Sequence, residues 1–132
     1  MSQENLETVR QAIAAINARD IDRYLSRCTE GIELLTPMGP IGGTYEGPED
    51  MRRFFADIED TAPDFRINLE HMEAIDEDRV LAFLRTTASM RASGIPTDVP
   101  VTNLYDFFDG KIRRVRIFFD REEALKAAGL SE

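Results

Sequence analysis

The segment NLYDFFDGKIRRVRIFFD, residues 103–120, decides the fold. Asp109 and Gly110 separate two runs in which apolar and polar residues alternate, and this dipeptide between such runs is a strong signal for a β-hairpin. Two more runs with a period of two precede the hairpin. Together the four runs predict antiparallel strands over residues 65–75, 79–91, 98–109 and 111–120.

The first half of the chain has the periodicity of helices. Apolar residues spaced by three and four predict a helix over residues 5–18, and a second helix is expected over 21–28, ended by Gly31. After a short strand over 32–35, a third helix is predicted from Pro48, and the C-terminal tail is predicted to form a short amphipathic helix. This order predicts an α+β fold, in which a curved antiparallel sheet wraps around the N-terminal helices as a cone.

The composition restricts the class of protein. With 132 residues, of which 42% are hydrophobic, the chain is expected to form one domain over residues 1–132. The net charge of −9 argues against a nucleic acid partner, because binding the phosphate backbone requires a basic surface. One Cys and one His cannot form a structural zinc site by themselves, so we expect no metal and no cofactor.

The same sequence gives an expectation about location. No apolar run approaches about 20 residues, which is the length needed to cross a bilayer, so no membrane partner is expected. The polar segment MSQENLETVR has no signal-peptide pattern, and a single Cys fits a reducing compartment. We therefore predict a cytoplasmic protein.

Four segments resemble a known family: VRQAIAAINARDIDRYL, YEGPEDMRRFFADI, FDGKIRRVRIFFD and DREEALKAAGL. Over nearly the whole chain they are similar to SnoaL-like proteins of the nuclear transport factor 2-like superfamily, also called ketosteroid isomerase-like, and to a bacterial subgroup of unassigned function. The resemblance implies a cone-shaped fold, a ligand-sized cavity and a homodimer. It does not imply a reaction, because the superfamily includes isomerases, cyclases, hydrolases, dehydratases and non-enzymes.

The resemblance also locates the positions of catalytic residues in steroid isomerases. The general base of those enzymes is an Asp just before a proline, and the corresponding residue here is Thr36, whose hydroxyl is too weak a base for proton abstraction from carbon. The oxyanion-binding Tyr corresponds to Ala12, and the second Asp to Thr102 or Leu104. Isomerase chemistry of that kind is therefore not expected.

Epoxide hydrolases of the superfamily activate water with an Asp-Arg-Asp set. The corresponding residues here are Ile117, Arg85 and Thr87, so only the Arg is present. SnoaL-type cyclases also use an Asp at the position of Ile117. Whether the protein is an enzyme stays open, and no catalytic residue is assigned.

The side chains that face the cavity follow from the hairpin register. A two-residue turn would pair Leu104 with Val115 and Thr102 with Ile117, which places these residues and Asp106 on the inner face. The pocket-lining candidates are Thr36, Tyr45, Phe54, His71, Phe83, Arg85, Thr87, Thr102, Leu104, Asp106, Val115, Ile117 and Phe119.

The same register predicts several large apolar side chains on the outer face of the last two strands. Such a face is not expected to remain in water, so a homodimer through it is the simplest prediction. The interface candidates are Val101, Asn103, Tyr105, Phe107, Arg114, Arg116 and Phe118.

Two polar candidates leave alternatives open. An inward Arg85 would need a partner, either Asp106, Glu33 or a ligand carboxylate; the favoured interpretation is that it lies half-solvated at the rim and spans two strands. His71 is the only His of the chain, yet no orienting group can be named from spacing, and a structural strand residue is the favoured interpretation.

The functional hypothesis is that the protein binds a small, mostly apolar organic molecule. The first alternative is an isomerase, cyclase or hydrolase acting on a small hydrophobic substrate; the second is a non-catalytic dimerisation module, its cavity filled by Phe54, Phe83 and Phe119. A cavity of about 300 Å³ or more would favour a ligand. The Gly- and Pro-rich segment of residues 33–47 has no phosphate-binding motif and is expected to form the hooked rim of the pocket.

Overall fold

The computed structural model describes residues 2–37, 43–89 and 91–130, so the centre of the expected hooked rim, residues 38–42, lies outside the described residues. Helices and strands mix in the first half, and strands dominate the second. The elements are α1 (Ser2–Ala18), α2 (Ile21–Ser26), β1 (Cys28–Thr36), β2 (Gly43–Glu46), α3 (Gly47–Thr61), β3 (Arg66–Asp76), β4 (Arg79–Ser89), β5 (Pro96–Phe108), β6 (Lys111–Phe118) and α4 (Arg121–Ala127).

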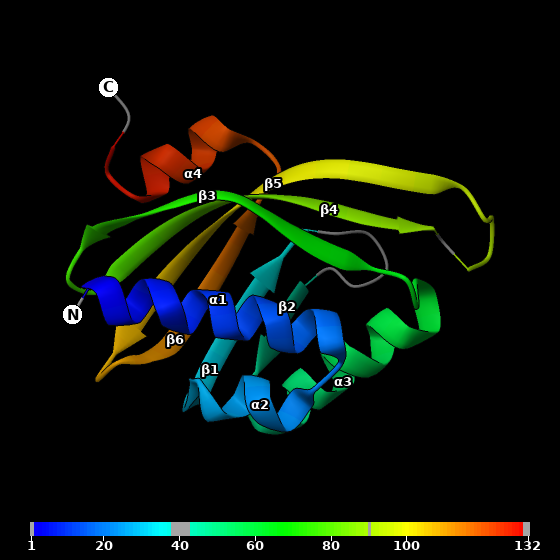
Figure 1. Ribbon diagram of the computed structural model, residues 1–132, viewed down its shortest axis with the longest axis horizontal. Coiled ribbons are helices and arrows are strands. Elements are labelled where there is room, and N and C mark those ends of the chain that lie inside the picture. Colours follow the sequence, from blue (N-terminus) through cyan, green and yellow to red (C-terminus); the bar gives the residue numbers. More distant parts are fainter. Residues whose placement is uncertain (1, 38–42, 90, 131–132) are drawn as a thin grey trace.

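One curved sheet organises the molecule. Its strand order is β2-β1-β6-β5-β4-β3, and all neighbouring strands are antiparallel except β1 and β6, which run parallel. Helices α1, α2 and α3 lie on one side of the sheet, and α4 lies on the other (Figure 1). The expected α+β architecture, with a sheet curved around the N-terminal helices, is confirmed.

The region after α2 differs from the prediction. The helix ends at Ser26, and Cys28 already begins β1, so Gly31 lies within a strand and does not end a helix. The reason is tertiary pairing: the backbone N–H of Ile112 donates to the carbonyl of Arg27, and Cys28 is paired with Ile112 in β6. The short strand β2 was not predicted.

Both faces of the sheet carry an apolar cluster. The inner cluster joins the sheet to α1, α2 and α3, and it includes fully buried Val9, Ile32 and Met51. The outer cluster is smaller and lies beneath α4, where Leu81 and Leu104 are fully buried with Ala124 and Ala128. The C-terminal helix therefore covers the outer apolar face of β4 and β5.

The predicted turn between β5 and β6 is confirmed. Asp109 and Gly110 have φ values of 53° and 78°, which is the left-handed region that a tight hairpin turn of this kind requires. Gly110 adopts it without a steric cost, and Asp is among the few other residues that tolerate it.

The strands beyond the turn contain a β-bulge that the sequence analysis did not predict. Phe107 is paired with Ile112, but Asp106 is paired with Arg114, so Arg113 is an extra residue on β6. A single extra residue shifts the register by one position and exchanges the two faces of the partner strand.

The bulge overturns the predicted pairing of the hairpin. Tyr105 is paired with Val115 and Asn103 with Ile117, whereas Leu104 had been expected opposite Val115. Val115 and Ile117 face inward as predicted, so on β5 the odd-numbered residues face inward with them. The predicted orientation of β5, and of β4 with it, was wrong.

Candidate ligand cavity

A cavity lies between the N-terminal helices and the sheet, and its volume is about 30 Å³. That is room for about two or three water molecules, since a water needs about 10–15 Å³ of such space. The lining residues are Ala12, Ile16, Tyr24, Leu34, Phe54, Phe65, Ile67, Leu84, Thr86, Val101, Asn103, Tyr105, Val115 and Ile117.

Of the predicted pocket-lining residues, Phe54, Val115 and Ile117 line this cavity. Ala12, the position of the isomerase Tyr, lines it as well. Three residues predicted for a dimer interface, Val101, Asn103 and Tyr105, also line it, because the bulge turns them inward; Phe107 is buried in the inner cluster.

The most polar part of the cavity wall is a pair of side chains on β5. Asn103 Nδ2 donates a hydrogen bond of 3.1 Å to Tyr105 Oη, and both side chains are buried. Asn103 Oδ1 is buried with no hydrogen-bond partner in the described part of the chain. A buried acceptor without a partner costs about 1–3 kcal/mol of stability, so it needs a reason.

Two further polar groups lie beside this pair. Tyr24, on α2, lines the cavity, and its pKa is raised well above the usual value, first by burial and then by its interactions with Cys28 and Tyr105. Burial also raises the pKa of the Cys28 thiol to about 12 and that of Tyr105 to about 12. All three groups are therefore neutral at physiological pH.

The rest of the wall is apolar. Thr86 is satisfied, because its hydroxyl donates to the carbonyl of Val99 at 3.3 Å. Among the described residues, none that lines the cavity is charged, and no His is present there. The cavity therefore presents apolar carbon surface and a few neutral hydrogen-bonding groups.

Six predicted pocket residues lie on the outer face of β4 and β5 instead. The physical reason is the register shift at Arg113, which exchanges inner and outer positions on β5 and, through the paired strands, on β4. These residues are Phe83, Arg85, Thr87, Thr102, Leu104 and Asp106.

Arg85 and His71, for which the sequence left alternatives open, both have contacts on that outer face. Arg85 Nε donates to Asp98 Oδ1 at 2.8 Å, and its side chain is 41% exposed, so it spans β4 and β5 in the half-solvated way considered above. His71 is exposed, contacts Glu73 at 3.1 Å and stacks on Phe83 with ring centroids 6.0 Å apart.

The remaining predicted pocket residues lie outside the cavity lining. Tyr45 is buried and donates to Asp57 at 3.1 Å, with the Arg53 guanidinium 4.4 Å from its ring centroid. Thr36 is buried at the end of β1, and Phe119, after β6, is about half exposed.

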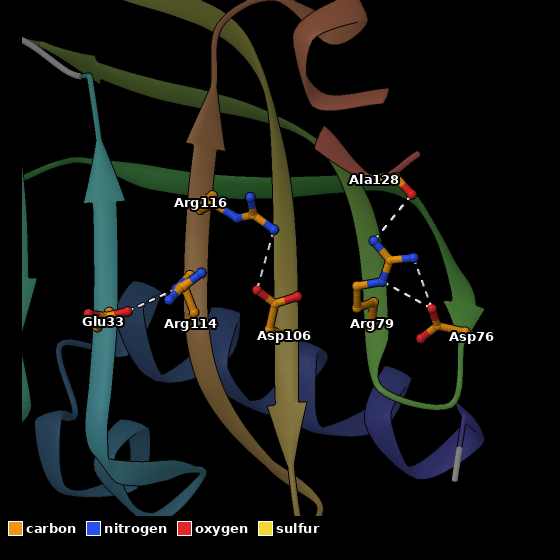
Figure 2. Close-up of polar contacts among 7 residues, drawn as sticks. All are labelled: Glu33, Asp76, Arg79, Asp106, Arg114, Arg116 and Ala128. Carbon is orange, nitrogen blue, oxygen red and sulfur yellow. Dashed lines mark hydrogen bonds and ion pairs between the residues drawn. The ribbon is translucent and has the colours of Figure 1, made fainter. Parts of the chain in front are cut away.

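Ion pairs connect the outer side of β1, β6 and β5. Arg114 Nε donates to Glu33 Oε1 at 2.8 Å, and Arg116 Nη2 lies 3.4 Å from Asp106 Oδ2 (Figure 2). Three predicted interface residues, Arg114, Arg116 and Phe118, lie on this outer face as expected. We use the name charge ladder for the four residues of these two ion pairs, which are Glu33, Arg114, Arg116 and Asp106.

A second ionic contact fixes α4 on the outer face. Arg79, on β4, lies 3.0 Å from Asp76 and donates to the carbonyl of Ala128 at 3.2 Å (Figure 2). A cation at the C-terminus of a helix is favourable, because the last carbonyl groups carry partial negative charge. Arg79 thus joins the β3–β4 turn to the end of α4.

The described residues include no group of three His, Cys, Asp or Glu side chains placed to hold a metal ion. Within the same residues, no helix has both the length and the apolar character needed to span a bilayer.

Sequence reasoning missed the Asn103–Tyr105 pair as a cavity feature. The signal that could have found it is charge: Asp106, Arg114 and Arg116 are more easily placed at a solvated outer face than inside a cavity. A register with Asp106 outside places Asn103 and Tyr105 inside.

Comparison with known proteins gives a consistent likeness. The model of the SnoaL-like domain matches residues 9–115. An uncharacterized cystatin-fold protein from Novosphingobium aromaticivorans is 28% identical with a TM-score of 0.74, covering 89% of this chain and 98% of that chain. Bal32a, from a soil-derived mobile gene cassette, is 27% identical with a TM-score of 0.80 and 88% of each chain covered.

A more distant structure shares the fold alone. It is a protein from Mycobacterium tuberculosis in complex with estradiol-17beta-hemisuccinate, 15% identical with a TM-score of 0.76, covering 92% of this chain and 97% of that chain. No curated protein matches the chain.

Proposed function

The chain belongs to the SnoaL-like domain family, and on that premise we propose that it binds a small, mostly apolar organic molecule in the cavity between its helices and its sheet. The observation that carries the proposal is the Asn103–Tyr105 pair, a neutral polar group with an unpaired acceptor inside an otherwise apolar cavity. Binding sites for small molecules combine apolar walls with a few placed polar groups in this way.

Structural neighbours support this choice. TerC was co-crystallized with polyporic acid, and the Mycobacterium tuberculosis protein was solved with estradiol-17beta-hemisuccinate. Both are small organic molecules bound by proteins of the same fold, which makes a ligand of that size a reasonable occupant here.

The cavity must widen to admit such a molecule, because its volume of about 30 Å³ is far below that of a ligand site. Phe65 and Ile117 are the lining residues with partial exposure, so the cavity comes closest to solvent beside them. Phe65 lies between α3 and β3 and outside regular structure, so we expect this part of the wall to move first.

Two adjacent residues on β6 provide the test. Ile117→Trp places a large side chain at the solvent side of the cavity, whereas Phe118→Trp places the same side chain on the outer face. Native mass spectrometry of the purified protein should detect a co-purifying small molecule in the wild type and in Phe118→Trp, and none in Ile117→Trp. Equal occupancy of the two variants would contradict binding in this cavity.

The lining offers little for general acid–base catalysis. In the part of the chain that the structure describes, no lining residue is a carboxylate or an imidazole, and the pKa of Tyr105 is raised to about 12. A phenol of such high pKa donates hydrogen bonds but is a poor proton acceptor at neutral pH. Binding is therefore the part of the hypothesis that the residues support best.

The second candidate is a non-catalytic module whose cavity is filled by its own side chains. The small volume of the cavity favours this candidate, and Phe54 is part of the cavity wall. Phe83 and Phe119 lie outside the cavity and do not contribute to filling it. Absence of any co-purifying molecule, together with no thermal stabilisation by a panel of apolar compounds, would favour this candidate over ligand binding.

A cytoplasmic homodimer stays a prediction. Val101, Tyr105 and Phe107, on which it was based, face inward. The outer apolar cluster is covered by α4, so Phe118 is the apolar interface candidate that remains on the outer face. Sedimentation velocity should show a dimer for the wild type and a monomer for Phe118→Asp. A monomeric wild type would contradict the prediction.

A further inference from the structure

We infer that the polar end of the bound molecule is an uncharged hydroxyl group, which donates to Asn103 Oδ1 and accepts from Tyr105 Oη. This inference rests on the proposed function and specifies the ligand class for the same cavity. It follows from counting the donors and acceptors that the pair offers.

The hydrogen bond within the pair determines what is left over. Asn103 Nδ2 donates to Tyr105 Oη, so the Tyr105 oxygen acts as the acceptor and its own proton points elsewhere. In the described part of the chain, the Tyr105 hydroxyl proton has no acceptor and Asn103 Oδ1 has no donor. The pair therefore offers one donor and one acceptor side by side.

The surroundings require the complementary group to be neutral. Tyr105, with its pKa raised to about 12, is uncharged, and so are Tyr24 and the Cys28 thiol beside it. No described residue of the lining carries a countercharge. A carboxylate or an ammonium group would lose its hydration without compensation, which disfavours charged ligands strongly.

A hydroxyl is the small group that matches this pattern through one atom. Its oxygen accepts one hydrogen bond and its proton donates another, whereas a ketone or an ether only accepts and would leave Asn103 Oδ1 unpaired. The present volume of about 30 Å³ already accommodates a group of that size. The apolar walls would contact the rest of the molecule as the cavity widens.

The experiment compares three probes of similar size: cyclohexanol, cyclohexanone and methylcyclohexane. Binding is measured by ligand-observed NMR titration against the wild type, Asn103→Leu and the control Thr102→Val, which makes a polar-to-apolar change on the outer face of the same strand. The wild type and Thr102→Val should bind cyclohexanol about 10- to 100-fold more tightly than cyclohexanone. In Asn103→Leu that preference should disappear while methylcyclohexane binding is retained or improved.

A second variant keeps the test decisive if Asn103→Leu does not fold. Tyr105→Phe removes only the hydroxyl, and it should lose most of the cyclohexanol preference with little change in shape. Equal binding of the alcohol and the ketone, or a preference for the ketone, overturns the hydroxyl inference and leaves the proposed function intact. If none of the three probes binds the wild type, ligand binding in this cavity is itself contradicted.

Discussion

The two faces of β5 differ in how their polar groups are satisfied. On the outer face, Asp106 is paired with Arg116 and Leu104 is fully buried beneath α4. On the inner face, Asn103 and Tyr105 are neutral, hydrogen-bonded to each other and left with an unused acceptor. Residues of β5 that face outward thus stabilise the fold, whereas the alternate residues that face inward keep a hydrogen-bonding group that the proposed ligand would use.

This difference shows where function should be sought. On the outer face the chain supplies a carboxylate for Arg116 and its own covering helix, although Arg116 Nε is buried without a hydrogen-bond partner among the described residues. The inner face leaves a buried acceptor unsatisfied in the wall of a cavity, where a ligand can supply the donor. Each substitution below tests one side of this contrast.

The largest effect is expected from a change of the β5–β6 register. Insertion of one alanine after Arg114 would move Val115 and Ile117 to the outer face and Arg116 to the inner face. We expect no cooperative thermal transition by circular dichroism, because an unpaired charge would enter the core. Deletion of Arg113 is the matched control: it removes only the extra residue, leaves Arg114 opposite Asp106 and Val115 opposite Tyr105, and should fold; a folded insertion variant would contradict the assigned register.

The outer apolar cluster should give the next largest effect. Leu104→Ala removes a fully buried side chain beneath α4 and should lower the free energy of unfolding by about 2–5 kcal/mol. The matched control is Leu35→Ala, on the same outer face but 36% exposed, with an expected loss below about 1 kcal/mol. Urea denaturation measures both, and similar losses would mean that α4 does not cover the sheet as described.

A pair of polar substitutions compares the two faces directly. Asp106→Asn leaves the largely buried Arg116 without its anionic partner and should cost about 1–3 kcal/mol. Asn103→Leu removes an unsatisfied acceptor but also the hydrogen bond to the buried Tyr105 hydroxyl, and because these two effects oppose each other the net change in the ligand-free protein should be within about 1 kcal/mol of zero. If Asn103→Leu is the more destabilising of the two, Asn103 has a structural role and the contrast between the faces fails.

The inner face should also be chemically inert. Because burial raises the pKa of the Cys28 thiol to about 12, the thiolate fraction at pH 8 is minute. Iodoacetamide should leave the native protein unlabelled and react fully in urea, as followed by intact mass spectrometry. Rapid labelling without denaturant would show that this side of the cavity is open to solvent.

The smallest effect concerns acid sensitivity of the charge ladder. The hydrogen bond and charge of Arg114 lower the pKa of Glu33 below its usual 4.5, so this carboxylate stabilises the fold above that pH and loses its contribution as the pH falls through the lowered value. The side chains of Glu33 and Arg114 are 30% and 42% exposed, so solvent screens the pair and its contribution is below about 1 kcal/mol. Glu33→Gln should reduce slightly the difference in melting temperature between pH 7 and pH 3; an unchanged difference would mean that Glu33 is not linked to stability.

Local signals predicted most of the fold. The Asp109–Gly110 turn, the periodicity of the strands and the apolar stripe of α3 each lie in a short stretch of sequence and follow from local geometry. The extent of β1 did not follow, because Cys28 enters the sheet through pairing with β6, which is distant along the chain. Long-range pairing of this kind leaves no periodic trace in a short segment.

The candidate site was harder to predict for a related reason. One inserted residue, Arg113, decides which of Asn103 and Thr102 faces the cavity. The charge of Asp106 favours the observed register, but no local pattern identifies the residue at which the bulge lies. The positions on β6 were right, since Val115 and Ile117 do line the cavity. The predicted inward and outward orientations were wrong on both β4 and β5, because the two strands are paired with each other and an error in one register passes to the other.

The parallel pairing of β1 with β6 also has a consequence for synthesis of the protein. In the sheet order β1 lies between β2 and β6, so the β1–β2 hairpin can form early, yet the other edge of β1 has no partner until residues 111–118 leave the ribosome. A nascent chain stalled before Lys111 exposes an unpaired strand edge, which is the kind of surface that aggregation uses and chaperones shield. The sheet is therefore completed only when β6, its last strand along the chain, has been translated.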